Sequence, residues 1–166
     1  MPCAADEVGL LEYARVLLPS LLVIAGWFVV YSLQKQAALR QDTRKDLRAR
    51  IDRLEGDLRG LNEKCIEYYT DSTKGFETST QIKVLTDDIR RQSLILSKNF
   101  LVNIGGSKVN DGLINLMTAA TGGKFESANR ISLKSNDRQL SQLFQSTARL
   151  ITLFEDGFFA AYPPVA

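Results

Sequence analysis

Residues 16–34 read VLLPSLLVIAGWFVVYSLQ, a run of 19 residues without a charged side chain. As an α-helix with a rise of about 1.5 Å per residue, the run would be about 28 Å long, close to the roughly 30 Å hydrocarbon core of a bilayer. A core helix of a small soluble domain would show a polar stripe along one face, and this run shows none. The run therefore predicts a transmembrane helix rather than a buried core helix.

The residues that precede the run differ from those of a cleaved signal peptide. Asp6, Glu7 and Glu12 lie there with Arg15, so no basic segment comes before the apolar residues. No small-residue cleavage site follows the run. We therefore expect the helix to stay attached as a membrane anchor.

Basic side chains gather on the C-terminal side of the run. Those expected to contact anionic lipid headgroups, at roughly 1 kcal/mol each, are Lys35, Arg40, Arg44, Lys45 and Arg48. The N-terminal flank offers Arg15 as its basic side chain. Because cytoplasmic flanks carry the excess of Lys and Arg, the pattern predicts a single-pass protein of the cell (inner) membrane, with the N-terminus outside and the C-terminus in the cytoplasm.

The predicted organisation has five segments. They are a short extracytoplasmic N-terminus (1–12), the transmembrane helix (13–34), a basic juxtamembrane and heptad stalk helix (35–70), a helical cytoplasmic module (76–160) and a loose tail (161–166). No proline separates the membrane helix from the stalk, so one helix is expected to continue through both. The fold class is predicted to be all-α, with the stalk packed against two or three further helices as a small bundle.

The stalk contains a repeating apolar pattern, which we call the seam. Its members alternate at spacings of four and three residues, as in a heptad repeat: Leu47, Ile51, Leu54, Leu58, Leu61, Cys65 and Tyr68. The seam predicts either a dimeric coiled coil or one helix of an intramolecular bundle. In a parallel dimer Arg50 and Glu55 would attract each other, whereas Gly56 and Gly60 lie off the seam. We favour the bundle because the later helices need a surface on which to pack.

Two helices are expected between the stalk and residue 122. The first runs over 77–103 and is terminated by Gly105 and Gly106. Its apolar stripe comprises Ile82, Leu85, Ile89, Leu96 and Phe100, broadened by Leu94, Ile95, Leu101 and Val102. The second covers 111–121 with Asn110 as its N-cap.

A less regular stretch over 123–135 precedes the last helix. Ile131 and Leu133 alternate with polar residues there, which is consistent with a short extended piece. The last helix is expected to span about 22 residues after a cap at Ser135 or Asn136. Its apolar face comprises Leu140, Leu143, Phe144, Thr147, Ile151, Phe154 and Phe158, with Leu150 at the edge.

The sequence offers little catalytic chemistry. It contains no histidine, which removes Ser-His-Asp and Cys-His catalysis and imidazole-ligated metal sites. The two cysteines, Cys3 and Cys65, are too few for a thiolate zinc site. Gly105-Gly106-Ser107-Lys108 lacks the spacing of a phosphate-binding loop. We therefore expect no catalytic residues, no metal and no cofactor, and the net charge of +2 gives no reason to expect nucleic acid as a partner.

Several side chains suggest packing or partner contacts instead. Cys65 is expected to be a buried apolar cysteine, with a contact across a dimer as the alternative. Each of the pairs Tyr68-Tyr69 and Phe158-Phe159 sits at a helix end. In each pair one ring is expected to enter the core while the other stays exposed as an anchor for a partner.

These observations favour a membrane-anchored helical interaction or scaffold protein without catalytic activity. It would bind the lipid bilayer and display its cytoplasmic module to a protein partner that the sequence does not identify, with a homo-oligomer left open. The alternative is a small membrane effector of toxin or anti-phage type, which oligomerises to perturb the bilayer. Pro19, Gly26 and Trp27 would then act directly. A lysis spanin with an external coiled coil would need the opposite orientation to the one that the flanking charges predict.

Overall fold

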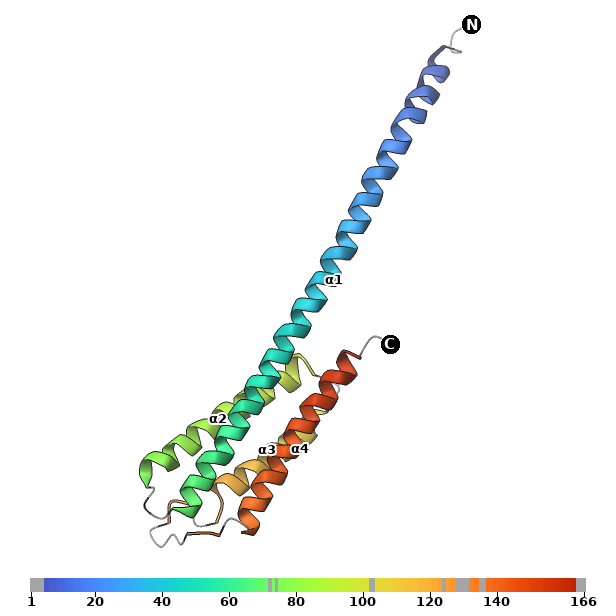
Figure 1. Cartoon of the computed structure of the whole chain (residues 1–166). Helices are drawn as coiled ribbons and strands as arrows, with labels where there is room; N and C mark the ends of the chain where they lie inside the picture. Colours follow the sequence, from blue (N-terminus) through green and yellow to red (C-terminus); the bar gives the residue numbers. More distant parts are fainter. Residues whose placement is uncertain are drawn as a thin grey trace. The chain divides into compact units, whose positions relative to one another are not determined.

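The protein is all-helical over the residues that the computed structural model describes, which are 5–71, 73, 75–101, 104–123, 125–127, 132–134 and 137–163. These residues form α1 (Ala5–Thr70), α2 (Phe76–Asn99), α3 (Gly106–Thr121) and α4 (Arg138–Ala161), and no strand (Figure 1). The predicted fold class is confirmed to this extent. The chain divides into two compact units, Met1–Lys45 and Asp46–Ala166.

The first unit contains the N-terminal part of α1. From Leu21 to Leu33 its large apolar side chains are exposed, with Trp27 at 77%. Within the described residues, one helix is long and apolar enough to cross a membrane, and none of its apolar window is buried in the protein. A long apolar N-terminal helix is therefore present, as the sequence predicts.

The second unit is an up-and-down bundle of four helical segments, of which the first is the C-terminal part of α1 (Figure 1). Side-chain contacts between α1 and α2 show that these two run antiparallel. Gln92 donates a hydrogen bond of 2.7 Å to the Asp57 carboxylate, and the Arg50 guanidinium lies 5.4 Å from the centre of the Phe100 ring.

Helix α4 also runs antiparallel to α1. The Thr147 hydroxyl donates to the Asn62 side-chain oxygen at 3.0 Å, and Arg48 lies 3.7 Å from Glu155. Helix α3 packs against both α2 and α4. Each helix of the bundle is antiparallel to the one that precedes it, and the α1–α2 and α2–α3 connections are short, as is usual for such bundles (Figure 1).

The seam lies in the core of this bundle. All of its residues are 0–3% exposed: Leu47, Ile51, Leu54, Leu58, Leu61, Cys65 and Tyr68. The favoured interpretation, a bundle formed within one chain, agrees with this burial. A coiled-coil dimer along the same seam would have to displace α2, α3 and α4.

Helix α2 buries Ile82, Ile89 and Leu96 of its expected stripe, together with hydroxyl residues that the sequence pattern did not single out. Hydroxyl and aliphatic residues alternate along it, at spacings of three and four: Ser79, Ile82, Thr86, Ile89, Ser93 and Leu96. Thr86 satisfies its hydroxyl by donating to the Ile82 carbonyl at 2.6 Å. Leu94 and Ile95, expected in the stripe, are 40% and 42% exposed. The buried face of α2 thus includes small hydroxyl side chains, which counting apolar residues does not reveal.

The α2–α3 connection differs from its prediction. Helix α2 ends at Asn99, because the chain turns at Phe100 and places Leu101 and Ile104 in the core at 2% and 6% exposure. Val102 lies outside the described residues. Gly105, with φ of +79°, is the N-cap of α3 rather than the end of α2.

Helix α3 accordingly begins at Gly106, one turn earlier than expected, and Asn110 is not its cap. The cause is Val109, which is fully buried on the core side of that turn and so makes helix formation there favourable. The expected cap of α4 is wrong in the same way. Asp137 is the N-cap, and its carboxylate accepts a 2.8 Å hydrogen bond from the Gln139 amide, whereas Ser135 and Asn136 lie outside the described residues.

The apolar face of α4 is rotated relative to the predicted one. Leu150, expected at the edge of the face, is 1% exposed, while Phe144, expected on the face, is 39% exposed. The buried face also contains Gly157, whose missing side chain leaves room for Ile104. Packing against two neighbouring helices, rather than hydrophobicity alone, determines which residues lie at the centre.

Alanine substitutions at three glycines of the bundle are expected to change its stability in opposite directions. A Cβ at Gly56 or Gly60 would meet no atom within 4 Å, so Gly56→Ala and Gly60→Ala should each stabilise the helix by about 1 kcal/mol. A Cβ at Gly157 would overlap the Ile104 side chain, so Gly157→Ala should destabilise the bundle by about 1–3 kcal/mol despite the better helix propensity. Urea unfolding of the three variants measures both. Destabilisation by Gly56→Ala would show that this face packs on another helix.

Candidate functional site

A polar cluster, which we call the Glu126 clasp, fastens the α3–α4 connection to α1 and α2. It consists of Glu126, Ser79, Lys83 and Tyr68. The Glu126 carboxylate accepts hydrogen bonds from the Ser79 hydroxyl at 2.9 Å and from the Lys83 ammonium at 2.7 Å. The Glu126 amide donates to the Tyr68 hydroxyl at 3.0 Å. With φ of +58°, Glu126 occupies the left-handed region, which the clasp compensates.

Aromatic packing surrounds the clasp. The Phe125 ring lies 5.2 Å from the Tyr68 ring and 5.9 Å from the Lys83 ammonium. Tyr69 packs edge-on against Tyr68, and its hydroxyl donates to the Ala120 carbonyl at 2.8 Å. The Leu133 amide donates to the Tyr69 carbonyl at 2.7 Å, whereas Ile131 lies outside the described residues. The connection is thus held to α1 by two hydrogen bonds and by the packing of Phe125 on Tyr68.

This packing corrects one expectation and agrees with another. Tyr68 and Tyr69 are both buried, at 3% and 2% exposure, because the α3–α4 connection covers the side of α1 expected to be open. Neither ring is therefore an exposed anchor. In the other pair, Phe158 is 4% and Phe159 is 51% exposed, as the sequence predicts.

The clasp contains a serine and a lysine, as a Ser-Lys catalytic dyad does, but its serine is not accessible to a substrate. The Ser79 hydroxyl, which would be the nucleophile, belongs to a residue only 1% exposed. The Lys83 ammonium, which would be the base, binds the Glu126 carboxylate rather than the serine. The geometry therefore suits fastening of the loop rather than nucleophilic attack.

The clasp predicts a dependence of stability on pH. Hydrogen bonds from Lys83 and Ser79 hold the pKa of Glu126 below its ordinary value of 4.5. Since the folded-state pKa is lowered, the stabilisation is complete above that ordinary value and is lost as pH falls through the lowered one. Urea midpoints of the native protein and Glu126→Gln should therefore differ most at neutral pH and converge in acid. Exposed Glu77→Gln is the matched control, and a gap that does not change with pH would contradict the expectation.

Cys65 lies in the core, as expected, and burial raises the pKa of its thiol to about 12. A thiol with such a pKa is protonated at neutral pH and is a poor nucleophile and metal ligand. Within the described residues, no group of three or more His, Cys, Asp and Glu side chains is placed to hold a metal ion.

The residues expected to pair across a dimer are engaged within the chain. Arg50 stacks on Phe100, as described above, and Glu55 forms an ion pair with Arg59 one turn along α1. Because the seam is also buried in the bundle, the surface proposed for an oligomer is occupied by α2, α3 and α4.

The cations expected at lipid headgroups fall in two groups. Lys35, Arg40, Arg44 and Lys45 belong to the first unit and are exposed. Arg48 belongs to the bundle, where it pairs with Asp52 at 2.9 Å and lies 5.8 Å from the centre of the Phe158 ring. Arg48 thus has partners inside the protein, and contact of any of these residues with headgroups stays a prediction.

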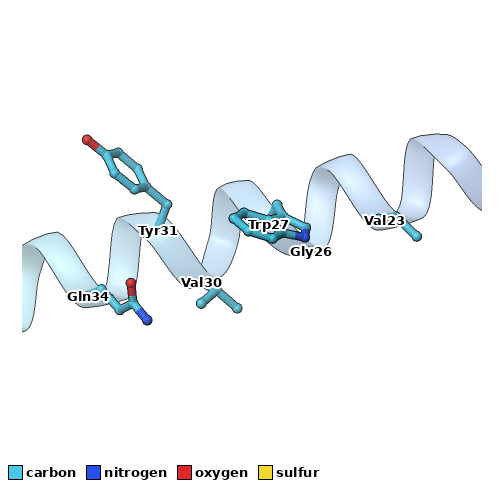
Figure 2. A pocket seen from close by; sticks show the side chains of 6 residues that line it. All are labelled: Val23, Gly26, Trp27, Val30, Tyr31 and Gln34. Atoms are coloured by element: carbon cyan, nitrogen blue, oxygen red, sulfur yellow. The ribbon is translucent and has the colours of Figure 1, made fainter.

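One face of the apolar helix is hollowed. Figure 2 shows the residues that line this hollow, which follow one another along a single stretch of α1: Val23, Gly26, Trp27, Val30, Tyr31 and Gln34. The hollow measures about 520 Å³, and nothing lies within 4 Å of a Cβ built at Gly26. A notch at glycine beside a large aromatic ring is a shape that a lipid chain or another helix can fill.

A second hollow, which we call the α3–α4 groove, lies on the bundle. It measures about 270 Å³ and is lined by Asn115, Thr118, Ala119, Gln142, Gln145, Ser146 and Arg149. Ala119 is buried and lies among polar side chains that come from both helices. These residues were not singled out from the sequence, because isolated amides and hydroxyls on a helix are ordinary surface residues until a second helix is placed beside them.

Comparison with known proteins adds no relative from which a function could be transferred: no protein-family model, no curated protein and no solved structure matches this chain.

Proposed function

We propose that this chain is a membrane-anchored, non-catalytic interaction protein that presents a four-helix bundle in the cytoplasm to a protein partner. The observation that carries the proposal is the contrast between the two units. The large apolar side chains of Leu21–Leu33 are all more than half exposed, whereas most of those in the bundle are buried in a common core or packed against it, with Phe76, Val84 and Phe159 among the exposed ones. Exposed apolar side chains at this density are stable only when lipid or another protein covers them.

The orientation in the membrane follows from charge. The exposed cations Lys35, Arg40, Arg44 and Lys45 come directly after the apolar run, on the side of the bundle in the sequence. This excess supports a cytoplasmic bundle. A C-terminal reporter fusion tests it: alkaline phosphatase activity outside the cytoplasm would overturn the orientation.

A non-catalytic role is supported by the state of the nucleophiles. Ser79 is buried and hydrogen-bonded to Glu126, and Cys65 is buried with a pKa of about 12. Both groups therefore contribute to packing rather than to chemistry with a substrate.

Extraction of membranes tests the anchor. The full-length chain should stay in the membrane pellet in alkaline carbonate and be released by detergent, because a span of this length is inserted rather than adsorbed. A double variant, Ile24→Arg with Val30→Arg, should move to the supernatant, since each central arginine costs about 2.5–3.5 kcal/mol on insertion scales. Leu39→Arg, outside the apolar run, is the matched control. Release of the unaltered chain without detergent would overturn the proposal.

A second candidate function is supported by the hollow at Gly26 and Trp27. Chains whose membrane helices associate through this face could cluster in the bilayer and perturb it, as a small membrane effector does. Induced expression with a membrane-potential dye separates the two candidates. Depolarisation that disappears on deletion of residues 1–34 and on Gly26→Ile, with Val29→Ile unaffected, would favour the effector over the scaffold.

A further inference from the structure

The α3–α4 groove contains polar side chains that the rest of the protein leaves unused. Within the described residues, none of its amide, hydroxyl or guanidinium groups forms a hydrogen bond or an ion pair. They are Asn115, Thr118, Gln142, Gln145, Ser146 and Arg149. Six convergent polar groups in one hollow are therefore available to a ligand.

The two hydroxyls of the groove are not bonded to the helix backbone, unlike several hydroxyls elsewhere in the helices. Thr80, Thr86 and Thr121 each donate to a carbonyl four residues earlier, at 2.6–2.9 Å. Thr118 and Ser146 make no such bond. Their donors and acceptors are thus not consumed by the helix backbone.

The charge of the groove is positive. Arg149 is its charged lining residue, and no carboxylate lines the hollow with it. Arg48, Arg59, Lys64, Lys83 and Arg91 are paired with acidic side chains, whereas Arg149, like the exposed Arg138 of the same helix, is not among the described ion pairs. A guanidinium without a counter-ion favours a ligand that supplies a carboxylate.

The dimensions of the groove suit a short peptide segment. Its α4 side runs from Gln142 to Arg149, which is about 10 Å at roughly 1.5 Å per residue. An extended chain rises about 3.3 Å per residue, so about three residues match this length. Carboxamide side chains both donate and accept, as do the amide and carbonyl groups of an extended backbone.

We propose that the α3–α4 groove binds an extended acidic segment of a protein partner. The three carboxamides bond to the backbone of the segment, and Arg149 binds one carboxylate side chain in a bidentate manner. This inference rests on the proposed function, since it names the surface of the bundle that recognises the partner.

Fluorescence anisotropy with a defined peptide tests the proposal. The probe is a labelled four-residue peptide with blocked ends and a single glutamate, added to the full-length chain in detergent micelles. Saturable binding is expected, and it should weaken at least about tenfold when the glutamate of the probe is glutamine or when the protein carries Arg149→Gln, since a charged hydrogen bond contributes about 1.5–3 kcal/mol. Arg138→Gln, an exposed arginine of α4 outside the groove, should bind as the unaltered chain does.

Three results would overturn the groove as a peptide site. They are absence of saturable binding, equal binding by Arg149→Gln, and full displacement of the peptide by an equal concentration of inorganic phosphate, which would make the hollow a general anion site. Gln145→Ala checks recognition of the backbone and should weaken binding of both peptides. Carbonate extraction of the same preparations is measured separately, so a failure of the groove is distinguishable from a failure of the membrane anchor.

Discussion

Replacement of Leu54 by aspartate is expected to abolish cooperative folding of the bundle. Leu54 is 1% exposed and lies in the core with residues of the other helices. Loss of its buried side chain costs about 2–5 kcal/mol, as in large-to-small core substitutions. An unpaired buried carboxylate adds several kcal/mol unless it takes up a proton. The sum is comparable to the roughly 5–15 kcal/mol by which such domains are stable.

The measurement should follow tertiary structure, because a helix in detergent keeps its helical signal whether or not the bundle is folded. Near-ultraviolet circular dichroism of the buried tyrosines and amide hydrogen exchange in α2–α4 meet this need. Ile66→Asp is the matched control on the same helix, since Ile66 is 37% exposed. Leu54→Ala gives a milder loss and stays measurable if the aspartate variant does not fold. Equal stability of Leu54→Asp and the unaltered chain would contradict burial of the seam.

Cys65 is expected to react with a disulfide reagent at least about a thousandfold more slowly in the native protein than in the unfolded chain. Burial raises the pKa of its thiol from 9.0 to about 12, which lowers the thiolate fraction at about pH 8 by that factor. Burial also blocks the approach of the reagent, since Cys65 is 0% exposed. The same burial makes the thiolate unavailable for a disulfide with a second chain.

The reaction is measured in a Cys3→Ser background, so that Cys65 is the sole thiol. A chain with Cys3→Ser, Cys65→Ser and Asn99→Cys places a thiol at an exposed position of α2 and should react at an ordinary rate. A native rate for Cys65 within about tenfold of the unfolded rate would show that the seam opens readily and would revive the dimeric alternative.

The two predictions bear on how the proposed membrane anchor and the bundle would share the work of binding a partner. A seam that is buried within one chain does not by itself recruit a partner or a second copy. Recognition then falls to surfaces that the core leaves free, such as the α3–α4 groove. For the same reason, a variant that unfolds the bundle should leave insertion of the apolar helix intact, because that helix carries its own 19-residue run without charge.

Helix boundaries were predicted less well than helix existence. A glycine pair such as Gly105 and Gly106 often marks a helix boundary. The sequence pattern alone does not say whether the pair ends one helix or begins the next. The core decides this, because Leu101, Ile104 and Val109 must all reach it from a short connection. The hydroxyl residues of α2 were missed for a related reason: Ser93 and Thr86 count as polar in a periodicity analysis, and only a neighbouring helix makes them buried.

The features that the sequence determined by itself depend on residues that are close together along the chain. The uncharged run at 16–34 and the heptad spacing of Leu47–Tyr68 specify a long apolar helix and a helix with one apolar face. The tertiary structure alone decided what covers that face, and it placed α2, α3 and α4 there rather than a second chain. It also brought Glu126 to Ser79 and Lys83, and Arg149 to Asn115. Such groups meet because distant segments pack together, and a periodic pattern carries no information about which segment packs on which.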